Sequence, residues 1–114
     1  MVRTEQEIHS IINELCDSIR VLFGEKTPEA ILFGSCARGD AEEGSDVDVM
    51  LLVDAPRSVI ADKNWQVGDV AAELLLTHDM LVSPIVENRA YFYENMDALP
   101  FYRNVQREGV HIVG

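Results

Sequence analysis

Two short apolar runs, separated by a polar loop, constrain the fold of this 114-residue chain more than any other feature of its sequence. The first run, residues 29–33, stops at Gly34 and Ser35, which is the pattern of a buried strand that enters a tight turn. The second run covers residues 46–53 and is rich in valine and leucine. In the loop between the runs, Ser35 is expected to cap a short helix. The pattern predicts two strands joined by a polar, partly helical loop.

Helical periodicities lie on both sides of these strands. Thr4 and Glu7 form a capping box, and isoleucine and leucine then recur at helical spacing until Gly24, which predicts an amphipathic helix. The further elements that we expect are a helix within residues 59–78, at least over its later half, a strand over 80–86, one or two helical turns over 88–95, a helix from Pro100 to residue 108 and an edge strand over 110–113. Because helices alternate with strands, the predicted class is α/β, with one small sheet.

The composition limits the kinds of protein that the chain can be. It has 9 basic and 20 acidic side chains, a formal net charge of −11, which argues against strong non-specific binding of nucleic acid. The sequence shows no secretory signal and no apolar run long enough to span a membrane, so we expect a cytoplasmic protein. Cys16 and Cys36 do not form a disulfide framework or a zinc motif. Residues 1–114 are expected to form a single domain.

Two aspartates at the start of the second apolar run form a candidate metal site. On a strand, residues two apart point to the same side, so Asp46 and Asp48 present their carboxylates together. Such like charges repel one another unless a cation lies between them, and carboxylate oxygens suit Mg²⁺ or Mn²⁺. A strand whose solvent face carries two aspartates by chance would show the same pattern. The pair alone therefore leaves both interpretations open.

The residues before this pair strengthen the metal interpretation. The turn at Gly34 and Ser35 exposes backbone N–H groups and a hydroxyl that can meet an anion. The whole pattern reads G-S-x-A-R-G followed by S-D-x-D and an apolar strand. This combination resembles the minimal nucleotidyltransferases of the DNA polymerase β superfamily. The resemblance is specific from residue 30 to residue 53 and looser at the ending LPFYRNVQREGVHIV.

The resemblance implies a nucleotidyltransferase fold, a small mixed β-sheet flanked by helices, and a role for each motif residue. Gly34 and Ser35 would hold the phosphates of a nucleoside triphosphate, expected to be ATP. Arg38, within the same motif, is a candidate to meet a phosphate, and a solvated surface arginine is the alternative. Asp46 and Asp48 would be catalytic and would bind the divalent metal, Mg²⁺ or Mn²⁺. The implied reaction transfers a nucleoside monophosphate to a hydroxyl group by in-line displacement.

The family usually supplies a third carboxylate from a later strand. Asp79 is the candidate chosen here, and Glu87 is the alternative, because alternation places both on one side of the segment 79–87. Ser83 occupies the middle of that side. If the third acid of the family aligns with Ser83, the chain lacks that acid.

The resemblance also suggests a partner. Larger relatives carry an extra domain that holds the acceptor, so we expect the acceptor site to come from another chain or from a second copy. Small chains of this type resemble the antitoxin of MNT–HEPN toxin–antitoxin pairs, which adenylylates its HEPN ribonuclease partner. Two alternatives stay open: a nucleotide- and metal-binding module without catalysis that acts through protein interaction, and a transferase that modifies a small molecule.

Overall fold

A four-stranded mixed sheet forms the centre of the molecule. The structure, a computed structural model, describes residues 4–24, 26–39, 41 and 45–112. The strands are β1 (Glu29–Phe33), β2 (Val47–Val53), β3 (Val82–Asn88) and β4 (Val110–Ile112). They lie in the order β3-β2-β1-β4, in which β2 and β3 are parallel and the other two pairs are antiparallel. The expected small mixed sheet is confirmed.

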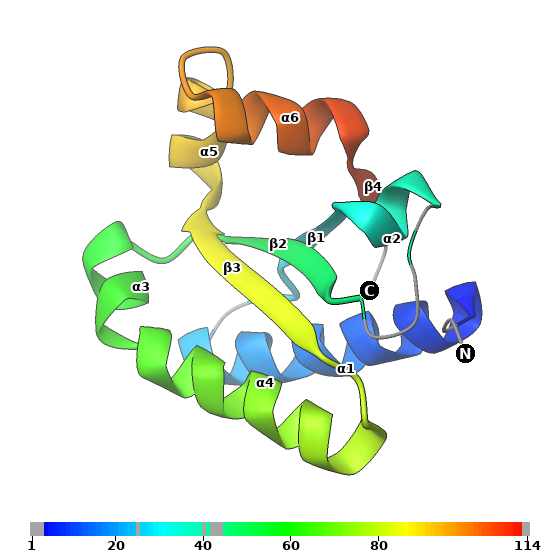
Figure 1. The fold of residues 1–114 in the computed structure, drawn as a ribbon. Helices are drawn as coiled ribbons and strands as arrows, with labels where there is room; N and C mark the ends of the chain where they lie inside the picture. The colour runs from blue at the N-terminus through cyan, green and yellow to red at the C-terminus, as the bar shows by residue number, and fades with distance from the viewer. Residues whose placement is uncertain (1–3, 25, 40, 42–44, 113–114) are drawn as a thin grey trace.

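Helices cover both faces of this sheet (Figure 1). The helices are α1 (Glu5–Phe23), α2 (Ser35–Arg38), α3 (Arg57–Asp62), α4 (Asn64–His78), α5 (Arg89–Asn95) and α6 (Pro100–Glu108). One face packs against α1 and α4, and the other packs against α5 and α6. The short helix α2 follows directly from the end of β1. None of the described helices combines the length and apolar character needed to cross a membrane.

The first helix forms where its local signals predict it. Thr4 and Glu7 exchange hydrogen bonds in the expected capping box, and Gly24 ends the helix in a left-handed conformation with φ of 63°. The buried face of α1 includes Ile12, Leu15 and Ile19, whose spacing of three and four residues matches one helical stripe. This stripe packs on the larger of two apolar clusters.

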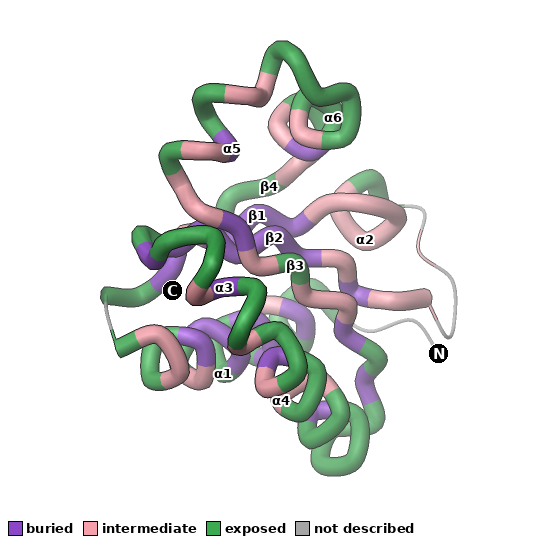
Figure 2. The backbone as a smooth tube through the Cα atoms, turned by 90° about the vertical axis from the view of Figure 1, so that its left-hand side faces the viewer, coloured by how far each residue is buried: buried purple, intermediate pink, exposed green. Residues whose placement is uncertain are grey.

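Alternation along the strands divides the apolar residues between the two faces of the sheet. Val47, Val49 and Leu51 of β2 join the cluster under α1 and α4. Met50 and Leu52 point the other way and pack with Phe92 and Val105 under α5 and α6. Figure 2 shows the buried strands lying between largely exposed outer helices. Because β2 is apolar on both sides, its only polar position, Asp48, stands out.

Three sequence predictions need correction. The segment 59–78 is two helices, because Lys63 leaves helical geometry between α3 and α4, and its ammonium donates to the backbone carbonyl of Leu22 on α1 at 2.6 Å. Ser35 is not the cap of α2, since Gly34 occupies that position with a φ of 75°. The third strand covers Val82–Asn88 and not residues 80–86, because its pairing with β2 starts at Val82, opposite Val47, and ends at Asn88, opposite Val53. Residue 113 of the expected edge strand lies outside the described residues.

Candidate active site

The candidate site lies where β1 ends and β2 begins. Phe33, the last residue of β1, is opposite Asp48 on β2, and Asp48 is in turn opposite Ser83 on β3. These three side chains therefore form one row across the sheet, on the face that α5 and α6 partly cover. Asp46 directly precedes β2. The structure thus brings both predicted aspartates to the end of the same strand.

Ser83 contacts the predicted metal-binding pair directly. Its hydroxyl donates a hydrogen bond to Asp46 Oδ2 at 3.1 Å. Register and contact together place Ser83 beside both aspartates, in the middle of the site. Alternation along the chain places Ser83 on the side of Asp79 and Glu87, but the hydrogen bond to Asp46 depends on the pairing of β2 with β3, which no local pattern reveals.

The two acidic candidates for a third carboxylate lie on either side of this position. Asp79 is exposed and ends α4 in a left-handed conformation with φ of 53°, three residues before β3 begins. Glu87 lies four residues beyond Ser83 on β3, which corresponds to about 13 Å along an extended strand. The structure places neither in the row that Asp48 and Ser83 share, and a catalytic role for Asp79 stays a prediction.

Gly34 is required by the close approach of the turn to Asp48. An ideal Cβ at Gly34 would lie 2.5 Å from Asp48 Oδ2, and the positive φ of 75° is itself unfavourable for residues with a side chain. The backbone of the turn at Gly34 therefore packs directly against the carboxylate of Asp48. This contact holds the predicted phosphate-binding residues Gly34 and Ser35 next to the predicted metal ligands.

Electrostatics at the site follow from this crowding. Partial burial and the nearby charge of Asp46 raise the pKa of Asp48, and the cation of Arg38 acts in the opposite direction. Arg38, at the end of α2, is exposed and forms an ion pair with Glu108 of α6 at 3.4 Å. Arg38, which is predicted to bind a phosphate, therefore lies at the edge of the site.

Cys36 contacts the backbone of the site. Its thiol donates weakly to the backbone carbonyl of Asp46 at 3.5 Å. Burial and the charge of Asp48 raise the pKa of this thiol, so it stays protonated at neutral pH. Cys36 and Cys16 are both free, and the geometry favours packing over nucleophilic chemistry for Cys36.

The donor set fits a divalent cation that is shared with a phosphate ligand. Asp46 and Asp48 supply hard oxygen donors whose mutual repulsion a cation would relieve. Across the described residues, no group of three or more His, Cys, Asp or Glu side chains is arranged to enclose a metal. Mg²⁺ typically binds through one or two carboxylates together with substrate phosphates, so two aspartates suffice.

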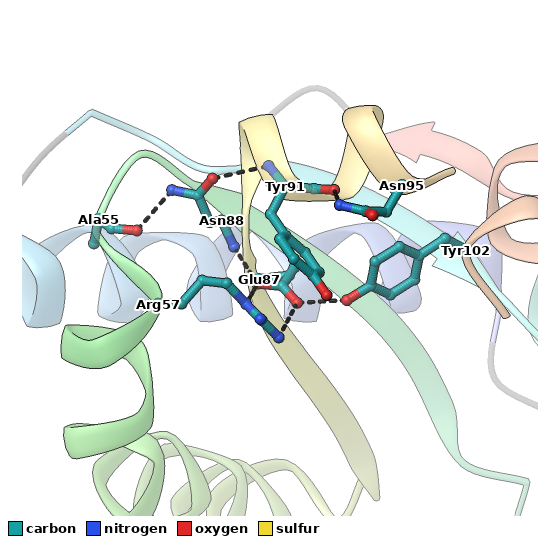
Figure 3. A network of polar contacts seen from close by, with 7 residues as sticks. All are labelled: Ala55, Arg57, Glu87, Asn88, Tyr91, Asn95 and Tyr102. Carbon is teal, nitrogen blue, oxygen red and sulfur yellow. Dashed lines mark hydrogen bonds and ion pairs between the residues drawn. The ribbon is translucent and has the colours of Figure 1, made fainter. Parts of the chain in front are cut away.

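A second polar network, which the sequence did not predict, forms at the opposite end of β3 (Figure 3). Glu87 is 7% exposed and accepts hydrogen bonds from Arg57 at 3.2 Å, from the backbone of Asn88 at 2.7 Å and from the Tyr102 hydroxyl. The Arg57 guanidinium also lies over the Tyr91 ring, 3.7 Å from its centroid. Glu87 therefore links α3 and α6 to the sheet and has a structural role.

The model of a nucleotidyltransferase domain family matches residues 11–110, a range that includes the turn, both aspartates and β3. The chain belongs to the nucleotidyltransferase domain family. It is a transferase by family, and the expectation drawn from the G-S and D-x-D motifs is confirmed.

Three curated relatives of this nucleotidyltransferase come from Methanocaldococcus jannaschii. The putative protein adenylyltransferase MJ0141 is 34% identical over 106 residues, covering 93% of this chain and 99% of the relative. The putative protein adenylyltransferase MJ0604 is 31% identical over 98 residues, which cover 86% of this chain and 90% of the relative. The putative protein adenylyltransferase MJ1305 is 32% identical over 83 residues, which cover 72% of this chain and 56% of the relative.

Proposed function

We propose that this nucleotidyltransferase transfers AMP from ATP to a hydroxyl group of a partner protein. The observation that carries the proposal is the contact between the Gly34 turn and Asp48, which joins a phosphate-binding turn to a pair of carboxylates. The names of the relatives, which describe protein adenylyltransferases, favour AMP as the transferred group and a protein as the acceptor.

Each residue of the site has a defined part in this reaction. The Gly34–Ser35 turn and Arg38 would bind the triphosphate, and Asp46 and Asp48 would hold Mg²⁺. When bound, Mg²⁺ supplies positive charge that favours departure of pyrophosphate. The acceptor oxygen would form a bond to the α-phosphorus while the bond to pyrophosphate breaks; pyrophosphate leaves with the bonding electron pair, and the proton of the acceptor hydroxyl passes to solvent. Asp79 is kept as the candidate third carboxylate.

The partner that we propose is a HEPN-type ribonuclease, with this chain as its antitoxin. The net charge of −11 supports this pairing, because an acidic surface complements the basic surface that a ribonuclease presents to RNA. Co-expression with the protein encoded beside it tests the pairing. A stable complex whose partner gains the mass of AMP is expected, and no association would contradict the antitoxin role.

Ser83 favours a second candidate function. Its hydroxyl, and not a carboxylate, lies beside Asp46 and opposite Asp48, so the site has two acids where a full catalytic set has three. A chain of this kind could bind ATP and metal and act only through its partner. The two candidates differ in one measurable property, the incorporation of AMP.

Calorimetric titration with a non-hydrolysable ATP analogue, with and without Mg²⁺, tests the site itself. Binding that needs Mg²⁺ and is lost in the Asp46→Ala/Asp48→Ala double variant is expected, whereas metal-independent binding would contradict the assignment. Incorporation of labelled AMP into a co-expressed partner then separates the candidates. Incorporation that is lost in Asp48→Ala supports the transferase, and binding without incorporation supports the non-catalytic module.

A further inference from the structure

The outer face of α4 carries an apolar surface that points away from the core. Trp65 is 67% exposed and Leu76 is 86% exposed, although both belong to a helix that buries Val67 and Leu74. α4 is the outermost helix on its side of the molecule (Figure 1). Exposed apolar residues that form a contiguous patch on a folded domain mark a candidate interaction surface.

These residues form one stripe along the helix. At 100° per residue, Trp65, Ala72 and Leu76 lie within about 40° of one another, opposite the buried Val67 and Leu74. Trp65 and Leu76 are three turns apart, about 16 Å along the axis. Ala72 lies between them and leaves a shallow centre with a larger apolar side chain at each end. This shape matches the length and surface of a second helix.

The charge of the face indicates what kind of helix fits. Asp69 and Glu73 are exposed beside the stripe, and α4 contains neither lysine nor arginine. A second copy of this chain would bring the same carboxylates to the contact, and the net charge of −11 would oppose its approach. A partner with basic residues beside an apolar stripe would be attracted by both features.

We propose that the outer face of α4, formed by Trp65, Asp69, Ala72, Glu73 and Leu76, docks an amphipathic helix of a partner protein whose apolar stripe is flanked by lysine or arginine. Trp65 and Leu76 supply the apolar anchors, and Asp69 and Glu73 set the preference for a basic partner. Docking on α4 does not depend on the proposed function, since α4 and the Asp46–Asp48 site lie on opposite faces of the sheet.

Trp65 is the single tryptophan of the chain, so its fluorescence reports on this surface alone. The probe is a synthetic amphipathic helix of leucine and lysine, about five turns long. We expect saturable binding with a shift of Trp65 emission to shorter wavelength, as the indole leaves water. A scrambled peptide of the same composition, which lacks the apolar stripe, and a leucine–glutamate helix should not produce the shift.

Two variants separate apolar docking from general attraction between opposite charges. Leu76→Glu adds a negative charge to the stripe, yet we expect it to weaken peptide binding by about tenfold, because the loss of one buried leucine outweighs the added attraction. Ala90→Glu adds the same charge on α5, across the sheet, and should leave the affinity within about twofold. Both positions are exposed, so neither variant should unfold the chain.

The results that would overturn the proposal are equally specific. No emission shift at saturating peptide would show that the face does not dock a helix of this kind. Equal binding of the scrambled peptide, or an unchanged affinity in Leu76→Glu, would show attraction by charge alone. Sedimentation of the free chain as a dimer that Leu76→Glu dissociates would assign the face to a second copy. The Asp46→Ala/Asp48→Ala variant should bind the peptide normally, which separates failure of this proposal from failure of the nucleotide site.

Discussion

Ser83 donates its hydroxyl hydrogen to Asp46 Oδ2 at 3.1 Å, across the pairing of two parallel strands. This bond occupies one oxygen of a predicted metal ligand. It also places a neutral side chain next to the two predicted metal ligands. The position therefore controls how many negative charges the site contains.

Replacing Ser83 with aspartate should lower the stability of the protein and raise its affinity for a divalent metal. We expect Ser83→Asp to lower the free energy of unfolding of the metal-free protein, because three carboxylates repel one another, and to raise the Mn²⁺ affinity by on the order of tenfold. Chemical denaturation and calorimetric titration measure the two effects. Ser83→Ala is the control: it loses one hydrogen bond, about 1 kcal/mol, and gains no metal affinity. Weaker Mn²⁺ binding in Ser83→Asp would contradict the assignment of the site.

We expect alanine substitutions to have different effects at Gly34 and Gly39, although the two glycines have similar conformations. Gly34 and Gly39 have φ of 75° and 80°, so the positive φ by itself should make alanine cost about 1 kcal/mol of stability at either position. Only at Gly34 would the new Cβ lie 2.5 Å from Asp48 Oδ2, since at Gly39 it meets no atom of the described residues within 4 Å. We expect Gly34→Ala to lose at least about tenfold in ATP-analogue affinity. Equal losses in both variants, measured by calorimetry, would argue against a special role for the Gly34 contact.

The ion pair between Arg38 and Glu108 should compete with a bound triphosphate. We expect Glu108→Gln to strengthen binding of the ATP analogue about two- to threefold, since an exposed pair contributes little, and Arg38→Ala to weaken it by about tenfold. Calorimetry at low and high salt checks both effects, which should shrink as salt screens the charges. Arg103→Ala, an exposed position on the same helix α6, is the matched control. Unchanged affinity in Arg38→Ala would remove this residue from the site.

The raised pKa of Tyr93 should affect how the free energy of unfolding changes in alkaline solution. Burial and a hydrogen bond to Glu29 raise the pKa of Tyr93 from 10.0 to about 12. Because the folded state favours the protonated hydroxyl, this contribution to stability is complete below pH 10 and is lost as the pH rises towards 12. Tyr93→Phe should therefore show a smaller fall in the free energy of unfolding between these pH values. Urea denaturation at several pH values measures the slopes, and parallel curves for the two proteins would contradict the prediction.

Local sequence signals determined much of the fold. The capping box at Thr4, the left-handed residue Gly24 and the apolar stripe between them mark where α1 begins, where it ends and which side it buries. The run before Gly34 and the alternation at Asp46 and Asp48 likewise predicted where two strands lie and where two carboxylates gather. These features depend on neighbours within a few residues, so periodicity and turn chemistry are enough to find them.

The tertiary structure alone decided which distant side chains meet. Strand register places Ser83 against Asp46, and helix packing brings Arg57 and Tyr102 to Glu87. The break at Lys63 also depends on a long-range contact, since its ammonium reaches the end of α1. Such contacts join residues separated by 15 to 41 positions along the chain. No local pattern encodes a pairing register or a helix position, because both result from packing of the whole core.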